Sequence, residues 1–578
     1  MKYTKVCIRI FKTGLSAAFC CMLVLLGACG DVPVIEQADT NIVQYTLPPV
    51  VESPVPAQGG ELKFPIPDST VLSDDFAAPD TQDDTTDTQN TSGFTLNPLK
   101  VKNVEMYNLF SLVYEQPVRI DVDGTVAPEL AETWEADATG AVWTFRLRKG
   151  VNWQNGSGEF TSADVIYTIQ QIKSYTEANS RYAQLSGIVS GFTAPDPYTV
   201  VITLTEPGNA ALYFMTFPVV CKAYCEANSI DTATPLGTGP YVVAEYVKDQ
   251  NMSLKANEAW WKQAPYIQSL TAVCYPDHTS ELKAFSEGEI DFITTSTISV
   301  DTYKKYEVSK SVDYLTQYYD CLVPNTASGF FSDINMRRML AFALDKRAIV
   351  SRALLGHAVA VDCPVAPDSY LSGDASSEYE YNIQNAFALL EQAGWEDRDD
   401  DDIRERVDGT QIIDLKIQLL IPLNREDTYR RDVADNIADQ LLQCGIDVEV
   451  VQKPYEEYKS SLESGAFELA LCSFYIDQNP DISFMLSSAG ASNYGKFADA
   501  EFDALIKNCA TALSEDDMKS AYIAMEKAFI DRLPQISLYF RTNALLCNAS
   551  INIPGTLRDM YVFNTVPQWY LYTKQPGT

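Results

Sequence analysis

Three phrases decide the fold of this chain: APELAETW at residues 127–134, WTFRLRKGV at 143–151 and FTSADV at 160–165. Apolar and polar residues alternate from Trp143 to Arg148, which predicts a half-buried strand. Thr161 is placed to cap the helix that follows, with Asp164 in the capping-box position three residues later and Val165 at the start of an apolar stripe. The stretch therefore predicts a strand followed by a capped helix.

The rest of the chain continues this mixed pattern. Folding is expected to begin near Gly59 and Gly60, and no internal repeat of fixed period is visible. Further strands are predicted at 61–67, 415–421, 448–451 and 467–475. Further helices are predicted at 334–355, 429–444, 499–508 and 516–533. We therefore expect a mixed α/β protein.

The first 28 residues have the features of a secretory leader. Four basic residues and no acidic one accompany an apolar run from Leu15 to Leu26, and Gly27 and Ala28 stand directly before Cys29. This order is typical of a signal peptide, and the cysteine makes it resemble a bacterial lipobox. The run is shorter than the roughly 20 residues of a spanning helix; a plain signal peptide or a short anchor is the alternative. We expect Cys29 to become the lipid-bearing first residue, with more than one acyl chain for stable attachment.

Two segments have compositions that do not support a packed core. Residues 29–58 are rich in proline, valine and acidic residues, and they predict a linker between the lipid and the folded part. Residues 68–93 hold seven aspartates and no basic residue, which predicts a mobile surface loop.

The composition excludes several classes of protein. The chain has 578 residues and a net charge of −35, with 46% apolar and 11% aromatic residues. These fractions are ample for packed cores, and the length corresponds to roughly three or four domains of about 150 residues. An acidic surface is repelled by nucleic acids and by anionic lipid head groups. It is compatible with cationic ligands, and equally with a role in solubility alone.

Motifs for catalysis are scarce. The histidines are His278 and His357, so a His-Glu-x-x-His zinc site is impossible. The chain has no Gly-x-Ser-x-Gly elbow and no phosphate-binding Gly-x-x-x-x-Gly-Lys-Ser/Thr loop. Ser280 and Lys283 match the Ser-x-x-Lys of acyl-serine enzymes without the accompanying Ser-Asp-Asn. We therefore expect neither an enzyme nor a resident metal or cofactor.

The cysteines and one acidic cluster each allow two interpretations, a structural one and a metal-binding one. Nine cysteines follow Cys29 at scattered positions, which is typical of small buried side chains, although Cys221 and Cys225 are close enough in sequence to pair or to bind a metal. The segment 397–402 has alternate aspartates, as a calcium loop does. It lacks the turn glycine at position six and the glutamate at position twelve, so a solvated acidic turn is the simpler interpretation.

Further phrases recur through the chain in a characteristic order. They lie at 95–99, 237–241, 257–261, 285–291, 325–350, 386–395, 493–494 and 501–505. Together with the opening stretch, over roughly residues 59–545, they resemble the extracellular solute-binding proteins of family 5. These are the peptide, oligopeptide and nickel receptors of ABC importers. Most of these residues are expected to be scaffold: Gly237 and Gly239 suit a turn with positive φ, and Arg337 suits the solvated face of a helix.

The resemblance implies a two-lobed α/β fold of the periplasmic-binding-protein type, with an extra subdomain inserted in the first lobe. Such lobes close on a ligand by hinge motion. Carried onto this chain, lobe I would comprise 59–100, 215–310 and 541–578, the insert 101–214, and lobe II 311–540.

The resemblance also implies ligand-binding residues at the end of one predicted strand. In peptide-binding members this strand ends in a tryptophan and then an aspartate that anchors the α-ammonium of the peptide. Aligned from the strand, Phe474 takes the tryptophan position, Tyr475 follows it, and Asp477 takes the aspartate position. Counted back from Pro480, Ile476 stands there instead, because the spacing is one residue shorter than usual. An enclosed carboxylate makes a strong contact to an ammonium; the alternative is an exposed turn aspartate.

The implied function is capture of peptides or oligopeptides and their delivery to an ABC permease and its ATPase. The receptor would be a monomer without nucleic-acid partners, lipid-anchored on the outer side of the cell membrane, facing the periplasm or the extracellular space. A nickel chelate, haem or an oligosaccharide is the alternative solute. A hydrolase, or a surface lipoprotein without a transport role, is the alternative class.

Overall fold

The computed structural model describes residues 56–68, 94–175, 182, 184–305, 308–327, 329–373, 379–423, 429–477 and 479–572. Residues from Val55 onward form one compact unit. The predictions for the leader, for Cys29, for most of the linker and for nearly all of the acidic loop lie outside the described residues. None of the described helices is long and apolar enough to cross a membrane.

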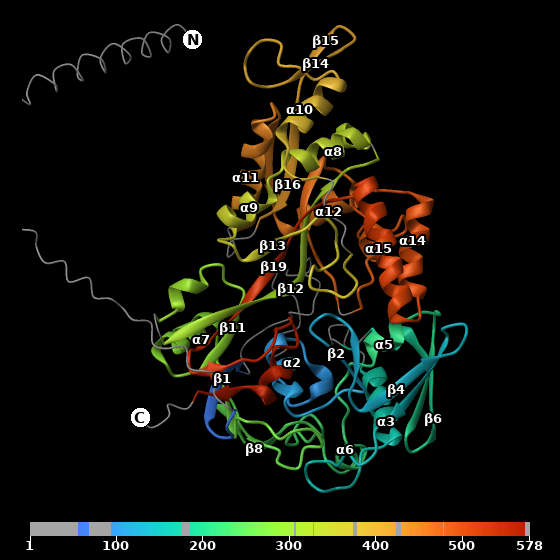
Figure 1. Ribbon diagram of the computed structural model, residues 1–578, viewed down its shortest axis with the longest axis vertical. Coiled ribbons are helices and arrows are strands. Elements are labelled where there is room, and N and C mark those ends of the chain that lie inside the picture. The colour runs from blue at the N-terminus through green and yellow to red at the C-terminus, as the bar shows by residue number, and fades with distance from the viewer. Residues whose placement is uncertain are drawn as a thin grey trace, which may run out of the picture. The chain divides into compact units, whose positions relative to one another are not determined.

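Two four-stranded sheets lie in the lower half of Figure 1. The first has the order β1 (Glu61–Pro67), β10 (Ser269–Tyr275), β9 (Asn251–Ala256) and β8 (Tyr241–Val247). Because β1 pairs in parallel with β10, the first strand of the fold joins a segment far along the chain. The second sheet is antiparallel, with the order β4 (Ala131–Ala136), β5 (Val142–Leu147), β7 (Thr199–Leu204) and β6 (Val189–Asp196).

The opening stretch folds as predicted. The strand at 143–148 is β5, and its side chains alternate between buried and more exposed positions. The helix is α3 (Ser162–Ser174), and Thr161 and Asp164 form the capping box. The Thr161 N–H donates to the Asp164 carboxylate at 2.9 Å. Both elements lie within 101–214, the range predicted for the inserted subdomain.

A larger mixed sheet connects the two halves of the molecule. Its order is β11 (Phe292–Thr295), β19 (Ile536–Asn548), β12 (Ser309–Pro324), β18 (Leu469–Tyr475), β16 (Lys416–Pro422) and β17 (Asp447–Lys453), with β13 (Ala358–Ala360) also paired to β19. The two longest strands, β12 and β19, run side by side from the lower half into the upper half (Figure 1). They are the two crossing segments about which the lobes can hinge.

Helices cover the upper part of this sheet. They are α8 (Ile334–Ala343), α9 (Lys346–Ala353), α10 (Ile383–Gln392), α11 (Tyr429–Leu442), α12 (Tyr455–Ser464), α14 (Ala500–Thr511) and α15 (Glu515–Arg532). The predicted single helical region at 334–355 is wrong, because it is divided into α8 and α9. Leu344 is extended, and the Asp345 side chain caps α9 by accepting a hydrogen bond from the Ala348 N–H. An aspartate that starts a new helix thus interrupts a continuous apolar pattern.

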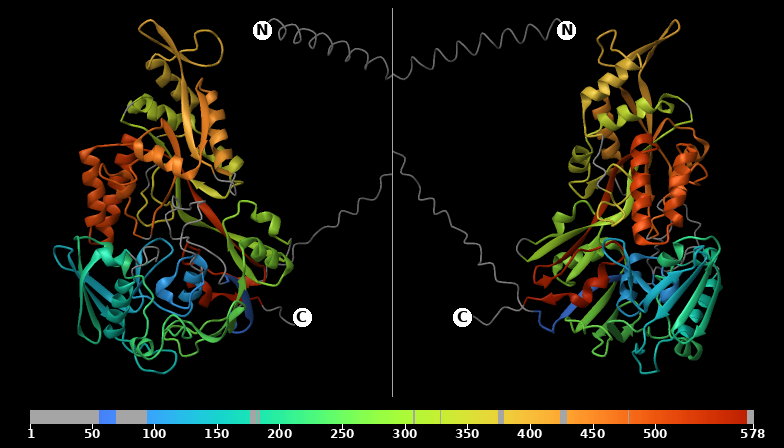
Figure 2. Two further views of the ribbon diagram at one scale, coloured as in Figure 1. Left: turned by 180° about the vertical axis from the view of Figure 1, so that it is seen from behind. Right: turned by 45° about the vertical axis from the view of Figure 1, so that its right-hand side comes forward.

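Short elements complete the described chain. They are η2 (Pro98–Lys100), α2 (Val104–Ser111), β2 (Val118–Ile120), β3 (Val126–Pro128), α4 (Leu185–Ile188), α5 (Ala210–Phe214), α6 (Lys222–Ala227), α7 (His278–Glu287), η3 (Val300–Tyr303), η4 (Phe330–Ser332), β14 (Glu405–Asp408), β15 (Gln411–Asp414), α13 (Ser483–Leu486), β20 (Ile551–Asn552), η5 (Val562–Gln568) and β21 (Tyr570–Leu571). The inserted subdomain touches the end of α14, where the Asn209 side chain donates to the carbonyls of Cys509 and Ala512 at 3.0 Å. Figures 1 and 2 show α14 and α15 next to the sheet formed by β4, β5, β7 and β6.

Residues from three separated phrases meet in one partly buried network. The guanidinium of Arg148 lies 4.4 Å above the Trp261 ring and donates to the Glu129 carbonyl at 3.0 Å. The Lys262 ammonium lies 2.9 Å from the Glu129 carboxylate and 3.2 Å from that of Glu115. These contacts explain why the phrases are scaffold: each supplies one side of a charge and aromatic cluster that joins the inserted subdomain to the first lobe.

Two predictions about scaffold residues are wrong. Gly237 and Gly239 do not have positive φ; a Cβ on Gly237 would lie 1.9 Å from the Val113 carbonyl oxygen, so close backbone approach requires the glycine. Arg337 is 6% exposed and not solvated. Its guanidinium donates to backbone carbonyls, including that of Leu533 at 2.9 Å, and joins α8 to the end of α15.

The nine cysteines after residue 29 are free thiols in the described chain. Six of them are buried. Burial raises the pKa of the Cys225 thiol to about 12, and the nearby Cys221 adds to this shift. At neutral pH this pair is therefore protonated, which disfavours metal binding by thiolate.

Candidate functional site

A pocket lies where the crossing strands pass between the lobes. Its lining comes from both halves: the turn after β2, the crossing strands, the segment after β13, the segment after β18, and the chain that follows β19. The residues that the argument below uses are Gln317, Asp368, Ile476, Asp477, Arg558 and Asp559. A ligand in this pocket would therefore touch both lobes.

Asp477 lies in this pocket. The strand β18 is buried along nearly its whole length, and it ends where the Ile476 N–H donates to the Gln317 carbonyl at 2.9 Å. Asp477 follows and is half-buried. It also lines a second pocket of about 380 Å³, together with Tyr213 and Asn479. The alignment from the strand puts Asp477 at the anchor position, and the alignment counted back from Pro480 puts Ile476 there. Both residues line the pocket, and of the two Asp477 carries a charge.

The pocket carries more negative than positive groups. Asp559 is 6% exposed, and its carboxylate adds to the burial that raises the pKa of Tyr314 far above its usual value. Asp368 is exposed at the rim. The described lining holds one guanidinium, that of Arg558, which also donates to the Val122 carbonyl at 2.8 Å. Three carboxylates with one guanidinium favour a ligand that carries a cationic group.

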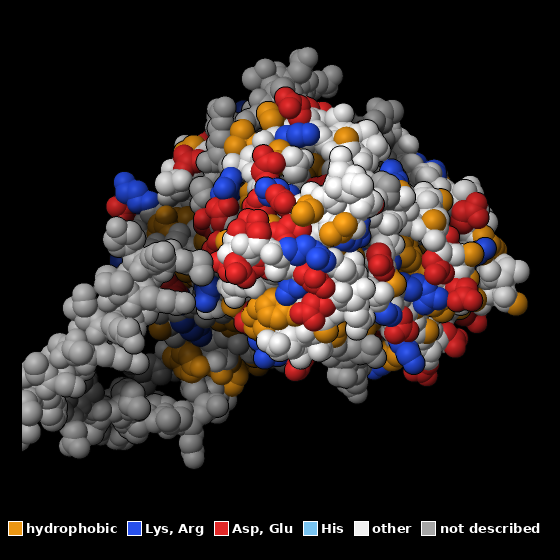
Figure 3. Space-filling model, turned by 90° about the horizontal axis from the view of Figure 1, so that it is seen from above, with side chains coloured by type: hydrophobic (Ala, Val, Ile, Leu, Met, Phe, Trp, Pro, Cys, Tyr) orange, Lys and Arg blue, Asp and Glu red, His pale blue; other side chains and the backbone are white. Residues whose placement is uncertain are grey.

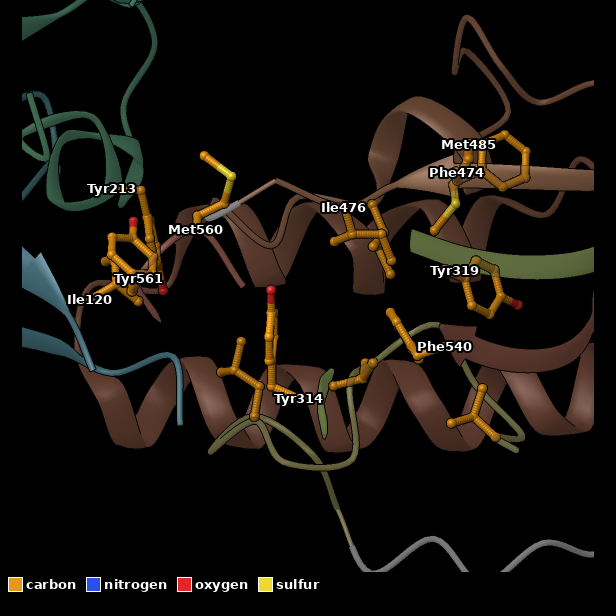
Figure 4. Close-up of a cluster of buried hydrophobic side chains, with 14 of the residues drawn as sticks. Ile120, Tyr213, Tyr314, Tyr319, Phe474, Ile476, Met485, Phe540, Met560 and Tyr561 are labelled. Atoms are coloured by element: carbon orange, nitrogen blue, oxygen red, sulfur yellow. The ribbon is translucent and has the colours of Figure 1, made fainter. Parts of the chain in front are cut away.

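The structure does not bring the other two predicted residues into the pocket. Phe474 is 3% exposed, and its ring packs 6.0 Å from that of Phe484 and 6.3 Å from that of Tyr494. Figure 4 shows Phe474 beside Met485, among core side chains. Tyr475 packs against Tyr318 at 5.2 Å. Neither ring is part of the described lining, so their contact with a ligand stays a prediction.

A buried charge cluster supports the crossing strands beside the pocket. Asp320 on β12 is 2% exposed, and its Oδ2 lies 2.9 Å from Nε of Arg541 on β19. The two groups are close without being aligned for a hydrogen bond, so the contact is an ion pair. Arg541 also donates to the Ser473 hydroxyl at 2.7 Å and lies 4.1 Å above the Tyr318 ring. The cluster fixes β12, β18 and β19 to one another where the hinge enters lobe II.

Sequence reasoning missed the pocket residues that come from the crossing strands and from the chain after β19. Gln317, Arg558 and Asp559 belong to no recognisable phrase, and they are far from Asp477 along the chain. Their positions result from the pairing of β12 with β18 and β19, which no local pattern encodes.

Comparison with known proteins identifies the family. The family model for the middle region of bacterial extracellular solute-binding proteins, family 5, matches residues 125–496. This chain belongs to family 5. The oligopeptide-binding protein AppA of Bacillus subtilis (strain 168) is 25% identical over 485 residues, covering 80% of this chain and 86% of AppA. The nickel-binding periplasmic protein of Escherichia coli (strain K12) is 26% identical over 372 residues, covering 62% and 69% of the two chains.

Solved structures show the same fold. The unliganded open form of MppA, a periplasmic murein tripeptide-binding protein, superposes with a TM-score of 0.74 at 20% identity, covering 89% of this chain and 98% of that one. NikA from Brucella suis in complex with Fe(III)-EDTA gives 0.68 at 22% identity, covering 89% and 100%. The two-lobed fold of family 5 is therefore confirmed, and the chain is the substrate-binding component of an ABC importer. The relatives named above are solute-binding proteins and not enzymes.

The remaining candidate catalytic groups of this family 5 protein lie on the surface. Lys283 is 71% exposed and lies 3.8 Å from the Glu287 carboxylate. His278 contacts Glu281 and Thr295 at 2.8 and 2.9 Å. Neither histidine is in the described lining of the pocket.

One acidic loop brings together groups that could hold a cation. Ligand atoms of Asp397, Asp399, Asp401 and Glu405 lie within 4.8 Å of one another. The three aspartates are exposed, and the buried Glu405 accepts a hydrogen bond from the Arg398 N–H at 2.8 Å. Figure 3 views the end of the molecule that carries this loop and shows acidic side chains interspersed with basic ones. The solvated acidic turn predicted from sequence agrees with this exposure.

Proposed function

We propose that this chain is a lipid-anchored receptor that captures short peptides with a free amino terminus and delivers them to an ABC permease. The observation that carries this proposal is the acidic pocket beside the crossing strands, which Asp477 and Asp559 both line. In this proposal Asp477 anchors the α-ammonium. Both partners in that contact would be charged, and charge-assisted hydrogen bonds are about twice as strong as neutral ones. Enclosure of the ligand would strengthen the contact.

The lobes would close around the peptide by bending β12 and β19. Closure joins the Asp477 side of the pocket, from lobe II, to the Asp559 side, from the first lobe. A ligand that contacts both sides favours the closed state by its differential affinity for that state. The permease and its ATPase would then recognise the closed receptor, which performs no chemistry on the ligand.

The domain boundaries and the membrane attachment belong to the same proposal. Lobe I at 59–100, 215–310 and 541–578, the insert at 101–214 and lobe II at 311–540 would move as units. Cys29 would hold the receptor at the outer face of the membrane through the linker 29–58. The proposed receptor acts as a monomer, because one chain supplies both sides of the pocket.

The test is to identify the ligand that the protein carries. The full chain, purified under native conditions, is denatured and the released small molecules are analysed by mass spectrometry. Short unmodified peptides, which return intact and stabilise the emptied protein against heat, are the expected result. A sugar, haem or a metal chelate would overturn the peptide proposal, and hydrolysis of the added peptide would overturn the receptor proposal.

A further inference from the structure

Gln317 lies at an irregularity in the crossing strand β12. β12 pairs with β19 as far as Leu315, opposite Thr542, and pairing resumes at Tyr319, opposite Phe540. Three residues of β12 therefore lie opposite one residue of β19. Such a bulge changes the direction of side chains and is frequent next to functional sites.

The backbone of Gln317 is held from both sides of the pocket. Its carbonyl accepts the Ile476 N–H at 2.9 Å, next to the proposed anchor Asp477. Its N–H lies 3.4 Å from the Asp559 carboxylate, in the chain that follows β19. Gln317 lines the same pocket as Asp477 and Asp559, the carboxylates that favour a cationic ligand group.

The side-chain amide of Gln317 is buried but not satisfied by the protein. The residue is 7% exposed, and neither Oε1 nor Nε2 has a hydrogen-bond partner among the residues that the structure describes. Buried amides are nearly always hydrogen-bonded, because an unmade bond keeps the full desolvation cost. Both a donor and an acceptor are therefore held ready at the pocket.

Gln440 shows what a buried structural glutamine looks like in the same lobe. It is 8% exposed, nearly the same as Gln317. Its Oε1 accepts the Asp345 N–H at 2.6 Å, and its Nε2 donates to the Asp345 carbonyl at 3.4 Å. Gln440 thus uses its amide to bind the backbone N–H and carbonyl of one residue, Asp345, at the start of α9.

We propose that Gln317 is a specificity-determining residue that binds the backbone N–H and carbonyl of one ligand residue, as Gln440 binds those of Asp345. Oε1 accepts the ligand N–H and Nε2 donates to a ligand carbonyl. This inference rests on the proposed peptide function and deepens it, because it selects ligands that have a peptide group close to their ammonium. A ligand with an ester at that place has no N–H for Oε1, and a simple amine has no carbonyl for Nε2. Each of them leaves part of the buried Gln317 amide unpaired.

The experiment compares Gln317→Met with Gln440→Met in the full chain. Methionine keeps the size of glutamine and removes both polar atoms. The first measurement is the melting temperature of the ligand-free protein: Gln317→Met leaves it unchanged or raises it, whereas Gln440→Met lowers it. A fall with Gln317→Met as large as that with Gln440→Met would show a structural role and overturn the proposal.

The second measurement uses a tripeptide that binds the wild-type protein, chosen from a pool with free amino termini, and its analogue with the first peptide bond replaced by an ester. Wild type binds the ester about tenfold more weakly, and Gln317→Met binds both equally. If Gln317→Met still binds the ester about tenfold more weakly than the tripeptide, this inference is overturned, and the proposed peptide function stays intact. If wild type binds no tripeptide, the proposed function fails and takes this inference with it.

Discussion

Replacing Lys262 by methionine removes the cation between two carboxylates in the network that joins the inserted subdomain to the first lobe. Its Nζ lies 3.2 Å from Glu115 and 2.9 Å from Glu129. Glu115 is 3% exposed and also accepts hydrogen bonds from Trp260 and Trp261. Breaking a buried ion pair costs about 3–5 kcal/mol. Because the Lys262 side chain is 27% exposed, water screens part of the interaction, and we expect a loss of about 3 kcal/mol at pH 8.

The loss should depend on pH in a definite direction. Burial raises the pKa of Glu115 from 4.5 to about 7, and Lys262 opposes this shift. The folded state therefore binds the proton more tightly than the unfolded state, so this group stabilises the fold fully below pH 4.5 and loses that contribution as the pH rises through about 7. Without Lys262 the pKa of Glu115 rises further. At pH 5 the carboxyl is then protonated and needs no cation, so the substitution costs less at pH 5 than at pH 8.

Urea unfolding of both proteins at the two pH values measures these losses. Lys416→Met is the matched control: its ammonium also lies between two carboxylates, at 3.0 Å from Asp414 and 3.9 Å from Asp447, but its side chain is 59% exposed. The control should change the free energy of unfolding much less than Lys262→Met does, because water screens an exposed ion pair. Equal losses for the two lysines, or a Lys262→Met loss that is the same at both pH values, would refute the reasoning.

Three further predictions concern the backbone, the hinge and the membrane attachment. Gly237→Ala places a Cβ 1.9 Å from the Val113 carbonyl oxygen; we expect a clear fall in melting temperature, and an unchanged value would contradict the close approach. Asp320→Asn leaves the Arg541 guanidinium buried without its carboxylate, so urea unfolding should show a loss of about 3–5 kcal/mol, and no loss would mean that the pair is fully solvated. Cys29→Ala should move the full chain from the membrane fraction to the soluble fraction, and retention in the membrane would argue against a lipid anchor.

Local patterns predicted the elements that depend on local chemistry. β1 begins and ends as expected, at Glu61 and Pro67, because its apolar run is bounded by glycines and an acidic segment. The capping box at Thr161 is also local, since it involves residues three apart. The division at Asp345 was missed because the apolar stripe continues across it, although the cap itself is local: the Asp345 side chain accepts a hydrogen bond from the Ala348 N–H.

The site was only partly predictable. The resemblance to a family predicts Asp477 as a ligand-binding residue; Asp477 lines the pocket, and its contact with a ligand stays a prediction. Phe474 was assigned by the same alignment, but alternation along a strand that is buried on both faces does not tell which side chain meets the ligand. Gln317 and Asp559 meet through strand pairing across more than two hundred residues, and such long-range register has no local signature.

The central claim is that Asp477 binds the free amino terminus of a peptide in the pocket between the lobes. Calorimetric titration of wild type and Asp477→Asn with one tripeptide and its N-acetylated form tests it most directly. A charge-assisted bond contributes about 1.5–3 kcal/mol. The account therefore predicts that Asp477→Asn weakens the free peptide about tenfold to a hundredfold and leaves the already weak acetylated peptide nearly unchanged. Equal weakening of both peptides, or no weakening of either, would contradict the claim.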